Sequence, residues 1–132
     1  LYRENKMTKL QKLKVELKNK GVDALLVLDE LNQHYLSDFA FTDGFLLITH
    51  AKAYLVTDFR YYEMALNSAD KEYKVVMPDN RAEFLDEFFS KNSVKVVGFE
   101  GGSVSYEVYK LYEQRHPHLK FVNIGKTICG DF

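Results

Sequence analysis

The sequence predicts an α/β domain with a mixed, mostly parallel sheet of about six strands flanked by helices. Segments with apolar residues at helical spacing alternate along the chain with short, continuous apolar runs, which are typical of strands buried on both faces. Two successive apolar runs lie close together, so one antiparallel hairpin is expected in the sheet. With 132 residues, 46% of them hydrophobic and 28% charged, the chain has enough apolar material for a single core.

The first helix is expected over residues 8–20. Leu10, Leu13 and Leu17 recur there at helical spacing, which gives the helix one apolar side. Gly21 follows at the position where a left-handed residue commonly ends a helix. We therefore expect this helix to lie on the sheet through its leucines.

Three strands are expected next, over residues 24–28, 45–49 and 53–57, and each is a run of mainly aliphatic or aromatic side chains. Residues 50–52 separate the last two strands and are short enough for a hairpin loop. A short helix around His34 is expected between the first strand and the second.

A helix that begins at Asp58 should follow the hairpin, because aspartate is a preferred N-cap residue. Its predicted inward side consists of four residues near helical spacing: Phe59, Tyr62, Leu66 and Ala69. The following strand is expected over residues 73–77, and Pro78 stops it.

Asn80 and Glu83 have the spacing of a capping box, which predicts the start of another helix. The apolar residues on its predicted inward side are Phe84, Leu85, Phe88 and Phe89. A strand over residues 95–99 and a glycine-containing loop follow.

Ser105 is expected to cap the last helix, which His116 and Pro117 end. Its predicted inward side consists of Val108, Leu111 and Tyr112. We interpret His116 as a cationic ring near the carbonyl end of this helix. A final strand is expected over residues 120–124.

Composition argues against several classes of function. The net charge is −1, with 18 basic and 19 acidic side chains, so no basic face for nucleic acid or for a membrane surface is expected. No apolar run approaches the roughly 20 residues of a membrane-spanning helix. The single cysteine, Cys129, allows no internal disulfide, and we expect a cytoplasmic protein.

Familiar catalytic motifs are missing from the sequence. It has no dinucleotide fingerprint after the first strand, no phosphate-binding loop of the Walker type, no H-E-x-x-H and no G-x-S-x-G. Residues 98–103, GFEGGS, join a strand to a helix and offer backbone amides, although adjacent glycines more often serve a turn. His116 and His118 lack a third metal ligand nearby in the sequence.

Residues 32–45, NQHYLSDFAFTDGF, raise the main question, because they combine one histidine, two aspartates and four aromatic rings. His34, Asp38 and Asp43 form a metal site or a catalytic group on one interpretation. On the other, they are the solvated side of an ordinary connection. The residues alone leave both interpretations open.

Three motifs in order make the chain resemble the amino-terminal domain of the creatinase/prolidase family, in particular the cytosolic Xaa-Pro peptidases. They are NQHYLSDF at residues 32–39, LVTDFRYYEMA at residues 55–65 and VVGFEGGSVSYEVYKLYE at residues 96–113. The resemblance covers residues 7–124 and implies a ribonuclease-H-like fold. Residues 1–6 would then lie upstream of the domain, and residues 125–132 would be a linker toward a catalytic domain.

In this family the chemistry belongs to a second, carboxy-terminal domain. There, two aspartates, a histidine and two glutamates hold two divalent metals (Mn, Co or Zn), which activate a water for attack on the Xaa-Pro amide bond. The resemblance therefore implies no catalytic residue, no metal ligand and no cofactor in this chain. It implies a homodimer, proline-containing peptides as substrates of the whole protein, and no activity for this domain alone.

The resemblance also gives residues 32–45 a role, since the loop after Y-L-S can reach the active-site mouth of a partner subunit. Four residues are predicted to form this substrate-access loop: Asp38, Phe39, Phe41 and Asp43. The alternative is that they are only loop surface, with Phe39 anchoring the core. Carboxylates there would attract a cationic substrate amino end, and rings would close the pocket wall. The family commonly has glycine or asparagine where this chain has Asp38, followed by smaller residues than those found here.

The remaining motif residues are expected to be structural. They are Tyr35, Leu36, Asp58, Arg60, Tyr61 and Glu100. We interpret Asp58 as a helix cap and Arg60 as its ion-pair or interface partner.

Two alternatives remain at this stage. The same architecture can be a non-catalytic binding module, in which case the metal ligands of the second domain would be lost. A small self-contained enzyme that uses His34, Asp38 and Asp43 would instead lose its activity when each is changed to alanine.

Overall fold

The computed structural model of the chain describes residues 7–125, apart from the side chain of Ser103. The predictions for residues 1–6, for Cys129 and for the linker beyond residue 125 lie outside this range. The sheet has the order β4-β3-β2-β1-β5-β6. Its strands are β1 (Ala24–Val27), β2 (Phe45–Thr49), β3 (Ala53–Val56), β4 (Lys74–Val76), β5 (Val96–Phe99) and β6 (Lys120–Asn123).

In this sheet β2 pairs antiparallel with both β1 and β3, and the other pairs are parallel. The predicted fold class, a mixed sheet with one hairpin, is confirmed. Because β2 alone is reversed in this sheet, the carboxyl ends of β1, β3, β4 and β5 share an edge with the start of β2. This edge carries the connections discussed below.

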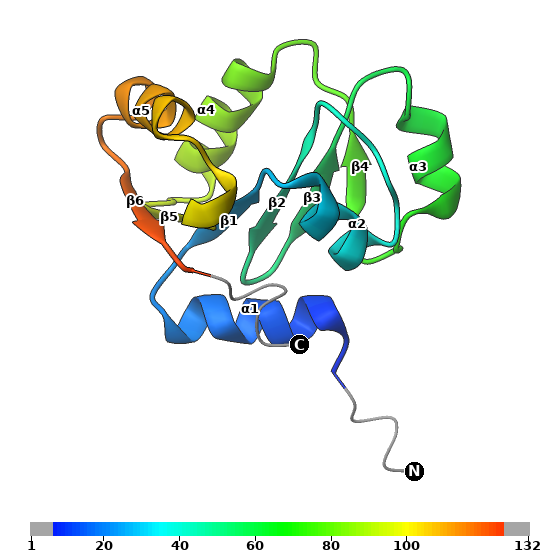
Figure 1. Cartoon of the computed structure of the whole chain (residues 1–132), viewed down its shortest axis with the longest axis horizontal. Coiled ribbons are helices and arrows are strands. Elements are labelled where there is room, and N and C mark those ends of the chain that lie inside the picture. The colour runs from blue at the N-terminus through cyan, green and yellow to red at the C-terminus, as the bar shows by residue number, and fades with distance from the viewer. Residues whose placement is uncertain (1–6, 126–132) are drawn as a thin grey trace.

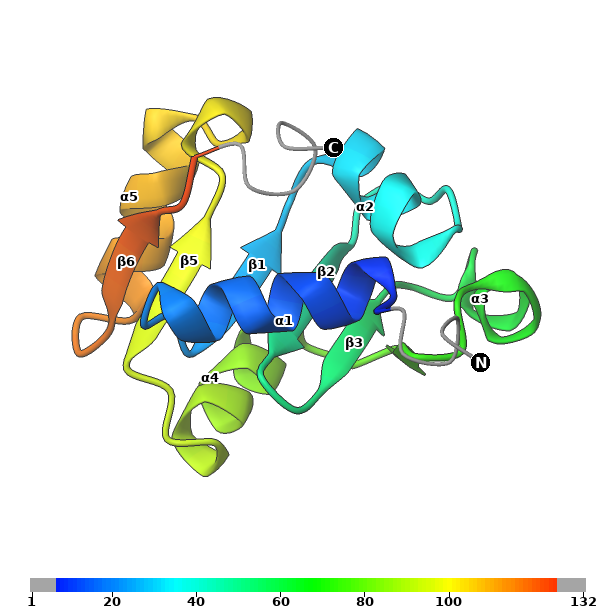
Figure 2. The same ribbon diagram turned by 90° about the horizontal axis from the view of Figure 1, so that it is seen from below.

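The helices cover both faces of the sheet. They are α1 (Lys9–Asn19), α2 (Glu30–Ser37), α3 (Tyr62–Ser68), α4 (Arg81–Lys91) and α5 (Tyr106–Arg115), with a short 3₁₀ turn η2 at Gly101–Ser103. Helix α1 crosses one face (Figure 2), and α4 and α5 lie on the other (Figure 1). We call these the α1 face and the α4–α5 face. No helix within residues 7–125 has the length and apolar character needed to cross a membrane.

The central strand β1 divides the core between the two faces. Its four residues are all buried. Leu25 and Val27 belong to the apolar cluster under α1, whereas Ala24 and Leu26 belong to the cluster under α4. This alternation follows from the two-residue period of a strand.

Helix α1 forms as the sequence predicts. Thr8 and Gln11 make a reciprocal capping box, with Thr8 Oγ1 accepting from the Gln11 amide at 3.1 Å and Gln11 Oε1 accepting from the Thr8 amide at 2.9 Å. Leu10, Leu13 and Leu17 are buried, which confirms the predicted apolar side. Gly21 lies just past the helix end with φ +70°, in the left-handed region.

The prediction for α3 was wrong in two respects. The helix begins at Tyr62 rather than Asp58, whose carboxylate instead bonds the Arg60 amide in a preceding turn. This turn changes which side faces inward: Ala65 is buried, while Phe59 and Leu66 are exposed. Ala69 is buried as predicted.

Helix α4 begins as predicted, because the Asn80 side chain accepts a hydrogen bond from the Glu83 amide at 3.1 Å. Leu85, Phe88 and Phe89 are buried.

The inward side predicted for α5 was right for Tyr112, which packs against the core, and wrong for Val108 and Leu111. Ser105 caps the helix, with its hydroxyl oxygen accepting from the Val108 amide at 3.2 Å. Val108 and Leu111, however, are exposed. No side chain of α5 is fully buried, so this helix covers the sheet less completely than its sequence suggests.

The interpretation of His116 as a cation was also wrong. The ring is buried, and its centroid lies 5.2 Å from that of Phe89. Its Nδ1 is 3.2 Å from Asp86 Oδ1. Burial lowers the pKa of His116, although Asp86 acts in the opposite direction.

Candidate functional site

The candidate site is the connection from α2 to β2, residues 38–44, which we call the 38–44 loop. Both of its aspartates have left-handed backbones, with φ 58° at Asp38 and 57° at Asp43. Asp38 is the C-cap of α2, and its amide donates to His34 O at 2.9 Å. Glycine and asparagine are the residues that enter this conformation most easily, and aspartate follows them. Asp38 therefore fits this αL cap, although glycine or asparagine would enter it more easily.

The inner side of the loop is held by a buried amide that the sequence analysis missed. Gln33 Nε2 donates to Val27 O at 2.9 Å and to Gly44 O at 3.0 Å, so one side chain joins the end of β1 to the end of the loop. Ser37 Oγ donates to Gln33 O at 2.7 Å. A Cβ at Gly44 would lie 2.3 Å from Val56 O, so only glycine allows this approach to β3.

The aromatic residues of the loop face the protein interior. Phe41 is 3% exposed and belongs to the core of the α1 face. Its ring centroid lies 6.0 Å from that of Phe39 and 6.4 Å from that of Tyr61. Tyr61 Oη and Thr42 Oγ1 are 3.0 Å apart. Phe41 is thus part of this chain's own core.

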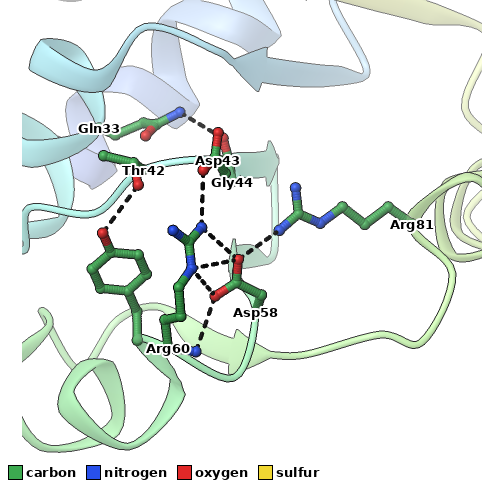
Figure 3. Close-up of polar contacts among 8 residues, drawn as sticks. Gln33, Thr42, Asp43, Gly44, Asp58, Arg60 and Arg81 are labelled. Carbon is green, nitrogen blue, oxygen red and sulfur yellow. Dashed lines mark hydrogen bonds and ion pairs between the residues drawn. The ribbon is translucent and has the colours of Figure 1, made fainter.

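The outer side of the loop is charged. Arg60 lies between two carboxylates, with its Nη2 2.9 Å from Asp43 Oδ2 and 2.8 Å from Asp58 Oδ2 (Figure 3). Arg81, the first residue of α4, is 4.0 Å from the same Asp58 oxygen. The group therefore joins the loop, the turn after β3 and helix α4.

This arrangement affects the ionisation of its members. The hydrogen bond to Arg60 lowers the pKa of the Asp58 carboxyl below its usual value. The hydrogen bonds to Asp58 and Asp43 raise the pKa of Arg60 further above its already high value. Asp58 and Arg60 therefore both stay charged at neutral pH. Two carboxylates share one guanidinium, with Arg81 at a longer distance.

Asp38 has a separate cationic partner. Lys9 Nζ lies 3.2 Å from Asp38 Oδ1 and also donates to Tyr35 O. The same ammonium stands 4.5 Å from the centre of the Tyr35 ring. These contacts fasten the start of the loop to helix α1.

The predicted site residues therefore fall into distinct groups. Asp43, Asp58, Arg60 and Tyr61 come together on one side of the loop, whereas Asp38 lies with α1. Glu100 is elsewhere, buried at the end of β5, where it accepts from the side chain of Asn32. Within residues 7–125, no three His, Cys, Asp or Glu side chains are placed to bind a metal. His34, Asp38 and Asp43 thus do not form such a centre.

The glycine loop after β5 is also satisfied internally. The Gly101 amide donates to Asn123 Oδ1 at 2.9 Å, and the Gly125 amide donates to the same oxygen at 2.8 Å. The turn interpretation of GFEGGS therefore fits the structure better than an anion site.

The structure is an α/β domain with a six-stranded mixed sheet and an anchored loop at one sheet edge. Comparison with known proteins identifies the family of this domain. The sequence profile of the creatinase/prolidase N-terminal domain matches residues 9–129, so the chain belongs to that family. "Uncharacterized peptidase YqhT" of Bacillus subtilis is 26% identical over 125 residues, which are 91% of this chain and 34% of that protein. The chain thus spans about a third of the length of this relative.

Solved structures agree with the family. The N-terminal domain of the cytoplasmic peptidase PepQ from Mycobacterium tuberculosis is 27% identical with a TM-score of 0.79, over 91% of this chain and 95% of that one. An Xaa-Pro aminopeptidase (aminopeptidase P) from Streptococcus thermophilus has the same fold, with a TM-score of 0.83 at 23% identity, over 91% and 92% of the two chains. The predicted family is confirmed.

Proposed function

We propose that this chain is the amino-terminal domain of a metal-dependent Xaa-Pro dipeptidase or aminopeptidase. In this proposal it supports a homodimer, and the 38–44 loop narrows the entrance to the partner subunit's active site. Proline-containing peptides are the substrates. A cytoplasmic location is part of the proposal, because the sequence has a single cysteine. Family membership and the peptidase names of the relatives support it.

The observation that carries the proposal is the two-sided construction of the loop. Its inner side is fixed by Gln33, Gly44 and the buried ring of Phe41. Its outer side presents the carboxylates of Asp38 and Asp43, whose side chains are 63% and 72% exposed. A rigid loop with exposed carboxylates suits the recognition of a substrate ammonium group, because no ordering cost is added on binding.

Asp43 is the stronger candidate for this contact. Its carboxylate shares Arg60 with Asp58, so these three side chains carry one net negative charge, which Arg81 offsets only from 4.0 Å away. Asp38 is paired one to one with Lys9. A substrate amino end near Asp43 therefore meets a carboxylate that its own chain neutralises only in part.

The two divalent metals of the proposed reaction supply the activated water in the catalytic domain. The described residues of this chain do not fit such a metal pair, because they contain no suitable group of ligands. No step of the hydrolysis is therefore assigned to residues 7–125. Their proposed contribution is to shape the entrance and to orient the substrate's amino end.

Hydrolysis of an Xaa-Pro dipeptide and an Xaa-Pro tripeptide tests this proposal. The purified 132-residue chain should show no turnover with or without Mn²⁺, whereas a longer polypeptide that continues into the catalytic domain should be active with Mn²⁺. Metal-dependent turnover by the isolated chain would overturn the proposal. An inactive longer polypeptide without the metal ligands would favour the binding module instead.

A further inference from the structure

The α4–α5 face contains an open groove next to the 38–44 loop, with Gly44 and Arg81 among its lining residues. It has a volume of about 380 Å³ and lies between α4 and α5 at the level of the β1 end. Its apolar lining consists mainly of Leu28, Phe45, Leu85, Val108, Leu111 and Tyr112. We call it the α4–α5 groove. The two helices that border it lie on the same side of the sheet (Figure 1).

The groove exists because Val108 and Leu111 of α5 do not pack against the sheet, whereas Tyr112 does. Leu111 is 59% exposed, and Val108 is exposed as well. Both side chains line the groove. Exposed aliphatic residues that face a concave apolar surface are the usual mark of a binding surface rather than of scattered surface residues.

The charged residues of the groove have one sign. Arg81 from the start of α4 and Arg115 from the end of α5 line it, and no carboxylate does. Burial raises the pKa of the Tyr112 hydroxyl, and the positive charges of Arg81 and Arg115 partly offset this rise. Among residues 7–125, Arg115 has no ion pair, and Arg81 has only the 4.0 Å contact with Asp58. An anion that entered the groove would therefore meet two weakly compensated cations.

From this arrangement we propose that the α4–α5 groove docks a short segment of another protein that presents leucine-like side chains next to carboxylates. The apolar lining would receive the aliphatic side chains, and Arg81 and Arg115 would pair with the carboxylates. The open rim favours a peptide segment over a small metabolite, because pockets for small ligands usually enclose most of the ligand.

The first experiment uses the full 132-residue chain, labelled with ¹⁵N, and a synthetic peptide as the probe. The peptide is acetylated and amidated, with leucines at helical spacing and glutamates between them. A second peptide has lysine in place of each glutamate. We expect the glutamate peptide to shift amide signals in α4 and α5, and we expect binding of the lysine peptide to be at least about tenfold weaker.

Two variants with matched controls locate the contact. Leu111→Glu should weaken binding of the glutamate peptide by about fivefold or more. Leu31→Glu should not, because Leu31 is 79% exposed on α2, outside the groove. Arg115→Glu should weaken binding of the glutamate peptide, whereas Lys12→Glu on α1 should leave it unchanged. Thermal melts of all four variants establish that each is folded.

Three results would overturn the proposal. One is the absence of shifts in α4 and α5 at millimolar glutamate peptide. Another is equal binding of the glutamate and lysine peptides, which would mean that Arg81 and Arg115 do not pair with the carboxylates of the peptide. The third is self-association of the wild-type chain in sedimentation that Leu111→Glu abolishes, because the occupant would then be a second copy of this chain.

Discussion

The two faces of the sheet are covered by helices with similar apolar patterns, yet they pack differently. On the α1 face, α1 buries three leucines and the loop aromatic Phe41 completes the core. On the α4–α5 face, α4 is well buried but α5 has no residue classed as buried. Helical spacing of apolar residues therefore does not predict by itself whether those residues pack against the sheet. Here one face supports a fixed loop, and the other leaves a groove.

The largest expected effect on the free energy of unfolding comes from shortening a leucine on the α1 face rather than on the α4–α5 face. Leu17→Ala removes a side chain that is fully buried under α1, and we expect it to lower the free energy of unfolding by about 2–5 kcal/mol. Leu111→Ala on α5 should change it by less than about 0.5 kcal/mol, because that side chain is exposed. Urea unfolding of both variants measures the difference. Similar losses in the two variants would mean that α5 packs as tightly as α1.

The next effect concerns the contact between the loop and β3. Gly44→Ala should lower the free energy of unfolding by about 1–3 kcal/mol, because the new Cβ would meet the backbone oxygen of Val56. Gly102→Ala is the matched control, since a Cβ there meets nothing within 4 Å. If urea unfolding finds the two variants equally stable, the loop is not held against β3 as described.

A loss of similar size is expected at Gln33. Gln33→Ala removes both hydrogen bonds from its side chain and leaves two carbonyl oxygens, of Val27 and Gly44, without that donor. The expected cost is about 1–3 kcal/mol. Gln114→Ala, on the exposed side of α5, should be nearly neutral. Hydrogen exchange provides the sharper measurement, because amides of the 38–44 loop should exchange faster in the Gln33 variant only.

The smallest effect depends on pH and belongs to the α4–α5 face. Burial lowers the pKa of His116 in the folded state below its unfolded value of about 6.5. Between these two pKa values the unfolded chain binds a proton at His116 that the folded chain does not bind. The stability from the neutral ring is therefore present above about pH 6.5 and declines as the pH falls below it. His116→Gln should lose this component of the pH dependence in urea midpoints, whereas His118→Gln should keep it. Identical pH profiles for the wild type and His116→Gln would refute this account of the buried ring.

Much of the fold was predictable from local sequence, because burial on both faces leaves continuous apolar strands and long helices keep their phase. Helix α3 shows where this reasoning fails. Because Asp58 and Arg60 form a turn, the helix begins at Tyr62 instead of directly after Asp58. The residues that face inward therefore differ from those predicted. Nothing in residues 58–69 taken alone distinguishes a helix cap from such a turn.

The candidate site was predictable only in part, for a different reason. Asp43, Asp58 and Arg60 lie in recognisable motifs, but their contact depends on the hairpin that brings the loop beside the turn after β3. Gln33 and Arg81 were missed because their partners are not their near neighbours in the sequence. A glutamine soon after a buried strand was the available signal for Gln33, since a buried polar side chain needs partners.

The most direct test of the central claim is the substitution Asp43→Asn in a longer, active polypeptide. Asparagine keeps the size of the side chain and accepts the left-handed backbone at this position, so the loop should retain its conformation. We predict that KM for an Xaa-Pro dipeptide rises about fivefold with kcat nearly unchanged, while Glu63→Gln on the exposed side of α3 changes neither. An unchanged KM in the Asp43 variant would contradict the claim that this loop meets the substrate's amino end.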